Sequence, residues 1–186
     1  MKLVTILLIF FISSGCNSSD LESNNSKQSE VVTTNNDTSM DNKLTSFNDI
    51  DKLPNQILVG IQSIIEKDNA VEINVYAFND TPIAGIQLQI NPSDIFQIDS
   101  IGGGRCSEID FTLRSNLKGL MLGFSMSGNM IPVSNSKKPS ENILFTAFGR
   151  VVKNVNSKNI VLDATLAGKG GVKLDALTVP YEWMGR

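Results

Sequence analysis

The sequence predicts an all-β protein whose folded part is a β-sandwich of about nine strands. Apolar and polar residues alternate with a period of two along most of the chain after Leu53, and turn-forming residues separate the alternating runs. No stretch has the apolar stripe of an amphipathic helix. The 186 residues are enough for one domain with tails. We therefore divide the chain into residues 1–15, 16–52 and 53–186.

The alternation is clearest in residues 71–77 and 84–90, where every second residue is apolar. A polar turn, NDTP at residues 79–82, separates these two predicted strands. In the last run, residues 172–179, the apolar phase slips at residues 176–177, which predicts a β-bulge there. The other predicted strands are residues 57–65, 95–101, 109–113, 120–126, 143–152 and 160–166.

Two of the predicted strands carry apolar residues on both faces, at residues 120–122 and 143–145. Strands of this kind are buried on both sides. We therefore expect them to run through sheet centres, with one face against the core and the other under a loop.

Residues 102–106 contain two features that could carry a function, a run of three glycines and a cysteine. The glycine run 102–104 is expected to be a flexible turn, because no Gly-Lys-Ser/Thr motif follows it and no helix is predicted after it. The chain has one other cysteine, Cys16, which its N-terminal context marks as a lipidation site. Cys106 then has no disulfide partner within the chain, so its thiol either crosslinks to another chain or is buried. We favour burial, because cysteine is among the most readily buried residues.

Composition excludes several classes of function. The chain has no histidine, which removes the commonest general base and the metal sites built on imidazole. Its 16 Lys and Arg residues against 19 Asp and Glu leave no positive surplus for nucleic acid. The densest acidic group, Asp94, Asp99, Glu108 and Asp110, matches no calcium-binding loop, so solvated carboxylates are expected there. The sequence predicts no enzyme activity, no cofactor and no metal site.

The N-terminus has the layout of an export signal. Lys2 precedes a largely apolar run at residues 3–12, and small residues then lead to Cys16. Ten helical residues rise about 15 Å, half of a hydrocarbon core of roughly 30 Å, so this run cannot be a permanent span. The pattern resembles the lipobox of bacterial lipoproteins, whose cysteine is acylated, although Ser13 stands where leucine is usual. We expect lipidation of Cys16, and the alternative is an ordinary secretory peptide.

Residues 17–52 are expected to be a disordered tether. Of these 36 residues, 18 are Ser, Asn or Thr, so the segment cannot bury enough apolar surface to offset its ordering entropy. In lipoproteins, asparagine after the cysteine, as at Asn17, indicates the outer membrane, so we expect an exported domain anchored there or at the cell surface. Near the end of the tether, Phe47, Ile50 and Leu53 have helix-like spacing, which predicts a short turn that docks on the domain.

Several short motifs of the folded part occur in a characteristic order. They are AGIQLQI at 84–90 after the turn at 79–82, LGFSMSG at 122–128 with Ile131-Pro132, the apolar strand at 143–151, and NIVL at 159–162 before the glycine turn at 168–171. In this order they resemble the cohesin-type modules of bacterial surface proteins, over about residues 56–179. The resemblance implies a nine-stranded jelly-roll sandwich with a binding or scaffolding role, since cohesins hold dockerin domains on one sheet face.

We expect this module to bind a surface protein partner or scaffold, and the alternative is a polysaccharide. Sugar rings pack on exposed aromatic side chains, and the candidate ligand-binding residues are Tyr76, Tyr181 and Trp183. Packing of Tyr181 and Trp183 against the end of the domain is the competing interpretation. The expected partners are thus a membrane, through the lipid on Cys16, and a protein or polysaccharide ligand, but no nucleic acid.

Overall fold

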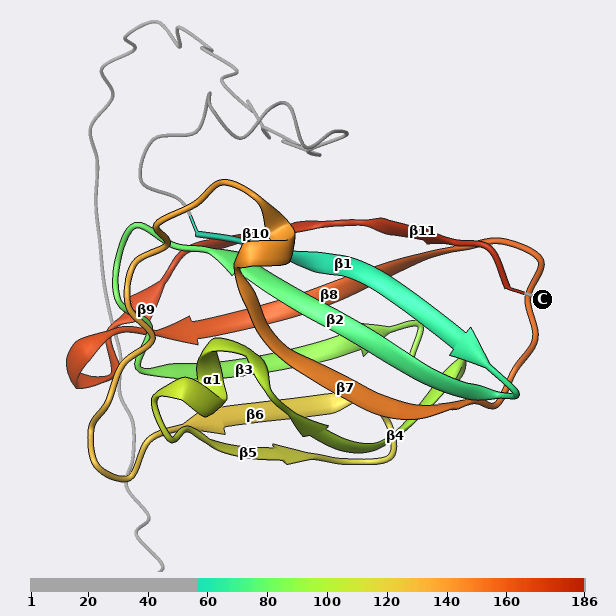
Figure 1. Cartoon of the computed structure of the whole chain (residues 1–186), viewed down its shortest axis with the longest axis horizontal. Coiled ribbons are helices and arrows are strands. Elements are labelled where there is room, and N and C mark those ends of the chain that lie inside the picture. Colours follow the sequence, from blue (N-terminus) through green and yellow to red (C-terminus); the bar gives the residue numbers. More distant parts are fainter. Residues whose placement is uncertain (1–56, 186) are drawn as a thin grey trace, which may run out of the picture. The chain divides into compact units, whose positions relative to one another are not determined.

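The computed structural model describes residues 57–185, which form two packed β-sheets (Figure 1). The predicted export signal, lipidation site and tether lie outside the described residues. The strands are β1 (Ile57–Lys67), β2 (Ala70–Phe78), β3 (Gly85–Asn91), β4 (Phe96–Gly102), β5 (Thr112–Ser115), β6 (Leu120–Phe124), β7 (Ile143–Val151), β8 (Lys158–Ala167), β9 (Lys173–Leu174), β10 (Ala176–Val179) and β11 (Tyr181–Trp183). Between them lie helix α1 (Gly104–Glu108) and the 3-10 turns η2 (Pro139–Glu141) and η3 (Lys169–Gly171).

The two sheets form a sandwich. The first sheet has the strand order β10-β1-β2-β7-β4, and the second has the order β11-β8-β3-β6-β5, with β9 also paired to β8. The paired strands are antiparallel, apart from β1 and β10, which run parallel. The predicted all-β sandwich is therefore confirmed.

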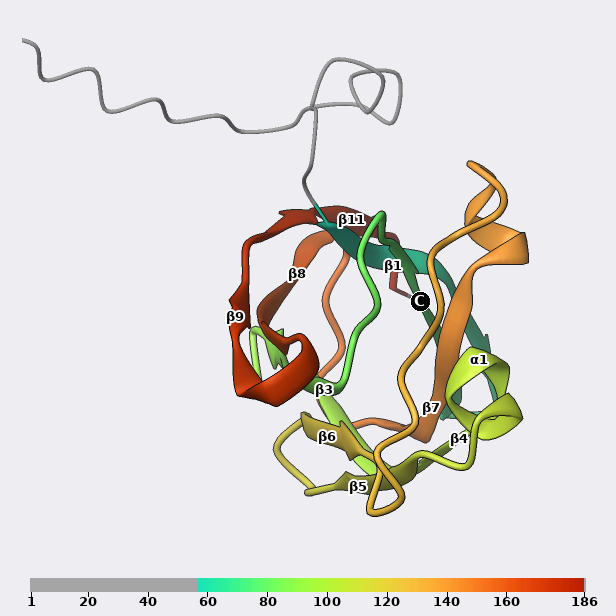
Figure 2. The ribbon, with the colours of Figure 1, turned by 90° about the vertical axis from the view of Figure 1, so that its left-hand side faces the viewer.

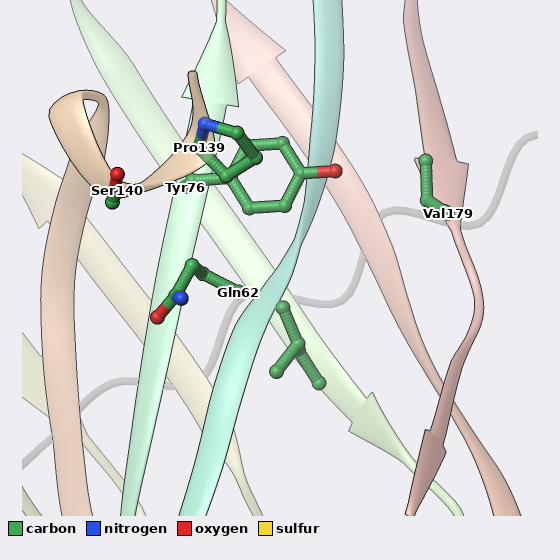
Figure 3. Close-up of a pocket in the computed structure, with 6 residues that line it drawn as sticks. Gln62, Tyr76, Pro139, Ser140 and Val179 are labelled. Atoms are coloured by element: carbon green, nitrogen blue, oxygen red, sulfur yellow. The ribbon is translucent and has the colours of Figure 1, made fainter. Parts of the chain in front are cut away.

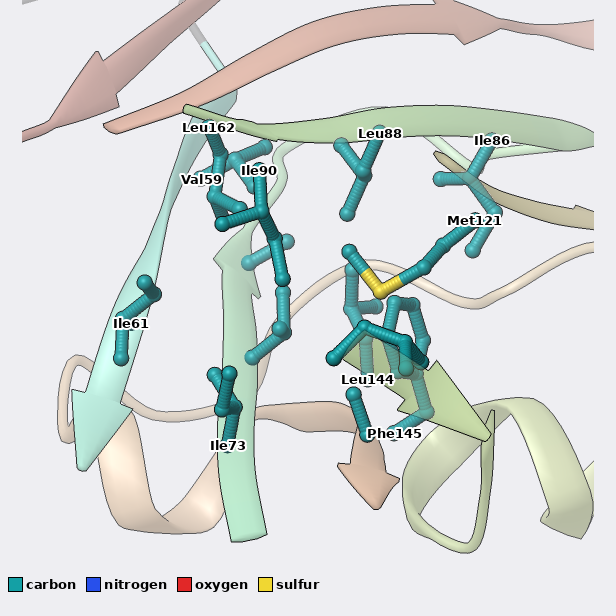
Figure 4. Packing of buried hydrophobic residues seen from close by; sticks show 14 of the residues in the cluster. Val59, Ile61, Ile73, Ile86, Leu88, Ile90, Met121, Leu144, Phe145 and Leu162 are labelled. Carbon is teal, nitrogen blue, oxygen red and sulfur yellow. The ribbon is translucent and has the colours of Figure 1, made fainter. Parts of the chain in front are cut away.

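The core lies where the inner faces of the two sheets meet. Leu88 of β3 and Met121 of β6 are at most 1% exposed, and they point toward Leu144 and Phe145 of β7 in the opposite sheet (Figure 4). Full burial of a side chain of this size stabilises the fold by about 1.5–3 kcal/mol. The period-two alternation seen in the sequence thus supplies the contacts that join the sheets.

The end of the chain differs from the predicted single strand with a bulge. β9 pairs with β8 of the second sheet, whereas β10 pairs with β1 of the first sheet. The slip in apolar phase therefore marks the change from one sheet to the other after Asp175, and the predicted bulge was wrong. This split, together with β11, turns nine predicted strands into eleven.

The glycine run at residues 102–104 leads into helix α1, so the prediction that no helix follows was wrong. Gly104 has φ +60°, and a Cβ atom there would lie 2.5 Å from the carbonyl oxygen of Leu144, so only glycine lets α1 approach β7 this closely. Cys106 of α1 is fully buried, as expected, and burial raises the pKa of its thiol to about 12. Within residues 57–185 no helix is long and apolar enough to cross a membrane.

A buried arginine connects α1 to two loops. Arg105 is 9% exposed, and its Nη1 donates hydrogen bonds to the carbonyl oxygen of Ala77 at 3.2 Å and to Oδ1 of Asn79 at 3.1 Å. Nη1 also lies 3.3 Å from Oγ of Ser134, and Nη2 donates to the carbonyl oxygen of Pro132. Burial lowers the pKa of Arg105, so these neutral acceptors compensate for lost hydration. The guanidinium thereby fixes the middle of the long segment between β6 and β7.

β7 also approaches β4 closely at Gly149. A Cβ atom at this position would overlap the carbonyl oxygen of Gln97. The register of the two strands shifts directly after Ile98, the partner of Gly149. The two backbones can pass this closely only because residue 149 has no side chain.

We expect Gly149→Ala to lower the free energy of unfolding by about 1–3 kcal/mol, because one of the two backbones must move. Gly102→Ala in β4 is the matched control, since a Cβ atom there meets nothing within 4 Å. Urea unfolding of both variants measures the difference. An equal effect of the two substitutions would contradict the close approach of β4 and β7.

We expect Arg105→Met to lower the free energy of unfolding by about 2–4 kcal/mol, because it leaves several buried oxygen atoms without a donor. Arg105→Lys should recover less than half of this loss, because a single ammonium group cannot donate to all the acceptors that the planar guanidinium reaches. Arg150→Met is the control, since Arg150 forms an exposed ion pair with Asp99 whose loss costs at most about 1 kcal/mol. Recovery of full stability by lysine would show that charge alone matters at position 105.

Candidate functional site

The structure places two of the three predicted ring residues, Tyr181 and Trp183, together on β11 and the third, Tyr76, on β2 of the other sheet. Trp183 is 4% exposed and packs on Phe96, with ring centroids 4.9 Å apart. Tyr181 is half-buried against the core, and its hydroxyl accepts a hydrogen bond from the backbone N–H of Ile64 at 3.4 Å. Tyr76 is 2% exposed on the outer face of the first sheet, and burial raises its pKa to about 12. Ligand binding by these rings stays a prediction that their burial does not support.

Two shallow hollows lie beside these rings. One of about 280 Å³ is lined by Glu66 of β1 and by Tyr181 and Trp183 of β11, among others. The other, of about 250 Å³, lies between Tyr76 and Pro139 of η2 (Figure 3). Both are smaller than the pockets of about 300–1,000 Å³ that hold small molecules in proteins. Neither hollow is large enough to be the candidate site.

The acidic residues that stand out in the sequence lie at the surface. Asp94 accepts a hydrogen bond from Nζ of Lys153 at 2.7 Å, which lowers the pKa of its carboxyl group. Asp99 pairs with Arg150 at 3.1 Å. Within the described part of the chain no group of three or more Cys, Asp or Glu residues is arranged to hold a metal ion.

A row of apolar side chains lies on the outer face of the second sheet, along β6. Met121 is buried and faces inward, so the alternating residues Leu120, Leu122 and Phe124 face outward. Leu120 and Leu122 are half-buried, and Phe124 is 40% exposed. Gly123 faces inward without a side chain, because a Cβ atom there would lie 2.7 Å from Cγ1 of Ile86. Most of the apolar side chains of β6 therefore face away from the core.

Polar side chains of the neighbouring strands border this row. Gln87 and Gln89 of β3 lie opposite Leu122 and Leu120, and Arg114 of β5 lies on the other side of Leu122. Nε2 of Gln89 donates to the carbonyl oxygens of Ile90 and Lys118, which fixes its orientation. The outer face thus presents an apolar row between amide groups and a cation.

An exposed methionine lies just beyond the end of this apolar row. Met126 is 85% exposed and lies in the turn that directly follows Phe124. Oγ of Ser125 accepts a hydrogen bond from the backbone N–H of Asn129 at 3.1 Å and lies 3.1 Å from Oγ of Ser127. These bonds hold Met126 in an ordered turn despite its exposure. We define Leu120, Leu122, Phe124 and Met126 as the β6 stripe.

The two sheets differ in what packs on their outer faces. Figure 2 shows α1 on the side of β7, with β3 and β6 on the other side of the sandwich. Ile143 of β7 is half-buried beside Tyr76 and Phe78, close to η2, in line with the expected cover by a loop. At β6 the expectation concerned residues 120–122, where Leu120 and Leu122 are half-buried on the outer face, and Phe124 beyond them is 40% exposed. The sequence shows the apolar residues of the β6 stripe, but it does not show that Phe124 and Met126 are exposed beside them.

Solved structures of cohesin modules are similar to this fold. A non-cellulosomal cohesin from the hyperthermophilic archaeon Archaeoglobus fulgidus has a TM-score of 0.51 at 14% sequence identity, over 69% of this chain and 90% of that one. The third ScaB cohesin of R. flavefaciens, in complex with a group 1 dockerin, has a TM-score of 0.47 at 13% identity, over 69% of this chain and 94% of that one. No protein-family model and no curated protein sequence matches the chain. The likeness to the archaeal module confirms that this chain has a cohesin-like jelly-roll β-sandwich fold.

Proposed function

We propose that the sandwich is a non-catalytic module that binds a protein partner through the outer face of its second sheet. The observation that carries this proposal is the β6 stripe, in which Leu120, Leu122 and Phe124 face outward on a sheet and Met126 is exposed just beyond its end. A cohesin-like fold accommodates such a role, but a fold alone does not define a function, and it is the exposed apolar face that supports binding.

The chemistry of this face fits a protein interface. Aromatic and methionine side chains are enriched in the centres of interfaces, and polar groups surround them. Here Phe124 and Met126 are exposed, whereas Gln87 and Arg114 border the apolar row. The side chains stand on a regular sheet and on a hydrogen-bonded turn, so little ordering entropy is lost when a partner packs on them.

The geometry supports a protein ligand over a polysaccharide. Two of the three rings that were candidates for sugar stacking, Trp183 and Tyr76, are 4% and 2% exposed and cannot offer their faces to a ligand without local opening, and the third, Tyr181, is half-buried. On the β6 stripe a single ring, Phe124, lies among aliphatic side chains, which suits the apolar side of a helix or strand of another protein.

Photocrosslinking tests the location of the binding surface. Benzoylphenylalanine replaces Phe124 in one variant and Phe148 in another, since these two phenylalanines are 40% and 41% exposed on different sheets. Irradiation of intact cells of the source organism should give a discrete protein adduct for position 124 and none for position 148. Adducts at position 148 alone would contradict the proposed surface.

The captured protein then allows a quantitative test. We expect Phe124→Ala to weaken its binding at least tenfold, because an exposed aromatic residue at the centre of an interface contributes more than about 1.4 kcal/mol. Phe148→Ala should leave the affinity within about twofold. Unchanged affinity after Phe124→Ala, or a glycan ligand that still binds this variant, would overturn the proposal.

We further propose that acylation of Cys16 anchors this module to the cell envelope, at the outer membrane or the cell surface. The sequence supports this, because small residues precede the cysteine and a largely apolar run stands before them. Stable anchoring needs more than one acyl chain, which a diacylated or triacylated cysteine provides. Residues 17–52 would then separate the module from the membrane.

Metabolic labelling with a clickable fatty acid tests the anchor. The full chain should be labelled and should sediment with membranes, whereas Cys16→Ser should lose the label. Cys106→Ser is the control and should keep the label, because the Cys106 thiol is buried. Labelling that survives Cys16→Ser would show that the lipid is attached elsewhere.

A further inference from the structure

Two exposed cations border one end of the β6 stripe. Arg114 of β5 lies directly opposite Leu122, and both side chains face outward because Leu113 packs against the core. Residues in this arrangement have Cβ atoms about 4.5–5.5 Å apart, so the side chain of Arg114 begins beside the apolar row. Lys118 is exposed in the turn between β5 and β6, two residues before Leu120.

Both cations stand on an ordered backbone. Nη1 of Arg114 donates to the carbonyl oxygen of Leu113 at 2.9 Å, which holds the guanidinium group beside β5. This bond uses one of the five N–H donors of the group, so the others remain for a ligand. In the turn, Oδ1 of Asn116 accepts hydrogen bonds from the backbone N–H groups of Lys118 at 2.9 Å and Leu120 at 3.0 Å. Little order is therefore lost when another molecule binds here.

No carboxylate of the described chain neutralises these two cations. Among residues 57–185, neither Arg114 nor Lys118 forms an ion pair. Three other exposed cations do have carboxylate partners, in the pairs Lys138–Glu141, Arg150–Asp99 and Lys153–Asp94. The positive charge beside the β6 stripe is therefore available to another molecule.

The carboxylates of the same region lie away from this end of the stripe. Asp163 of β8 is separated from β6 by β3, and it accepts a hydrogen bond from Nδ2 of Asn91. Glu108 and Asp110 precede β5, at the end of the strand that pairs with Phe124. β3, the other neighbour of β6, carries no charged residue. Beside the stripe, positive charge is thus confined to β5 and the turn that follows it.

We propose that the partner presents carboxylate side chains next to its apolar contact, and that Arg114 and Lys118 bind these carboxylates beside Leu120 and Leu122. The proposed binding face is the basis of this inference, which adds the chemistry of the partner. A guanidinium group can donate two parallel hydrogen bonds to one carboxylate. A protein segment with apolar residues on one side and Asp or Glu along one flank matches both features. Complementary charge of this kind speeds association and rejects basic competitors.

The turn favours carboxylates of a protein over a phosphate group. Phosphate sites in loops are built from several free backbone N–H groups that point at the anion. Here the N–H groups of Lys118 and Leu120 are bonded to the side chain of Asn116, and that of Gly119 is bonded to the carbonyl oxygen of Asn116. The side chains of Arg114 and Lys118 are then the contacts left for an anion, and the apolar row beside them suits a protein segment.

Selection from a phage-displayed library of random peptides tests the charge of the partner. The full chain in detergent is the bait, and peptides that also bind the Phe124→Ala variant are removed. Among the peptides that depend on Phe124, Asp and Glu should be at least twofold enriched over the input library. Phe124-dependent peptides without this enrichment would overturn the inference alone. The absence of any Phe124-dependent peptide would overturn the proposed face, and the inference with it.

Affinities of one selected acidic peptide then test the two cations. Arg114→Glu with Lys118→Glu should weaken its binding at least tenfold, and binding to the wild type should weaken between about 0.1 M and about 1 M salt, where the Debye length falls from about 10 Å to about 3 Å. Lys158→Glu is the control for a change in net charge, since Lys158 is exposed on β8 beyond the end of β3. It should leave the affinity within twofold.

A charge swap separates a direct contact from a loss of folding. The same peptide with Lys in place of its Asp and Glu residues should bind the doubly substituted variant more tightly than the wild type. This requires a folded variant, which is expected because both substituted residues are exposed. Equal weakening by the double substitution and by Lys158→Glu, or no gain from the charge swap, would overturn the proposed contact.

Discussion

The packing of β3 and β6 against β7 is the contact on which the rest of the structure depends. Leu88 and Met121 on one sheet meet Leu144 and Phe145 on the other, and all four side chains are at most 1% exposed. Because side chains alternate along a strand, fixing which residues face inward also fixes which face outward. The β6 stripe is thus a direct consequence of the core. A shift of β6 by one residue would bury the stripe and expose Met121.

Much of the fold could be predicted from the sequence, because the alternation of apolar and polar residues identifies a half-buried strand without knowledge of its neighbours. Residues 71–77 and 84–90 are examples. The exchange of sheets after Asp175 could not be predicted, because β9 and β10 are too short to show which partner strand each one takes. Helix α1 was also missed, since its five residues are held by contacts with β7 and by Arg105 rather than by helix propensity.

The candidate site could be predicted from the sequence only in part, for a related reason. β6 has apolar residues in both phases, and the phase with more of them, Leu120, Leu122 and Phe124, faces outward. Hydrophobicity alone would place that phase in the core. Gly123 decides which of the two sets of alternate residues faces the core, because its missing side chain makes room for Ile86. This is a tertiary contact, which one sequence does not reveal. Two aromatic residues that the sequence suggested as ligand contacts pack within the fold instead. Trp183 packs on Phe96, and the ring of Tyr76 lies against Gly60.

In this account the outer face of the second sheet binds a partner, whereas the outer face of the first sheet does not. Hydroxyl-radical footprinting on intact cells, compared with the purified protein, tests this division most directly. Oxidation of Phe124 and Met126 should slow severalfold on cells, where a partner is present, whereas oxidation of Phe148 should be the same in both samples. Equal slowing at all three residues, or slowing at Phe148 alone, would contradict it.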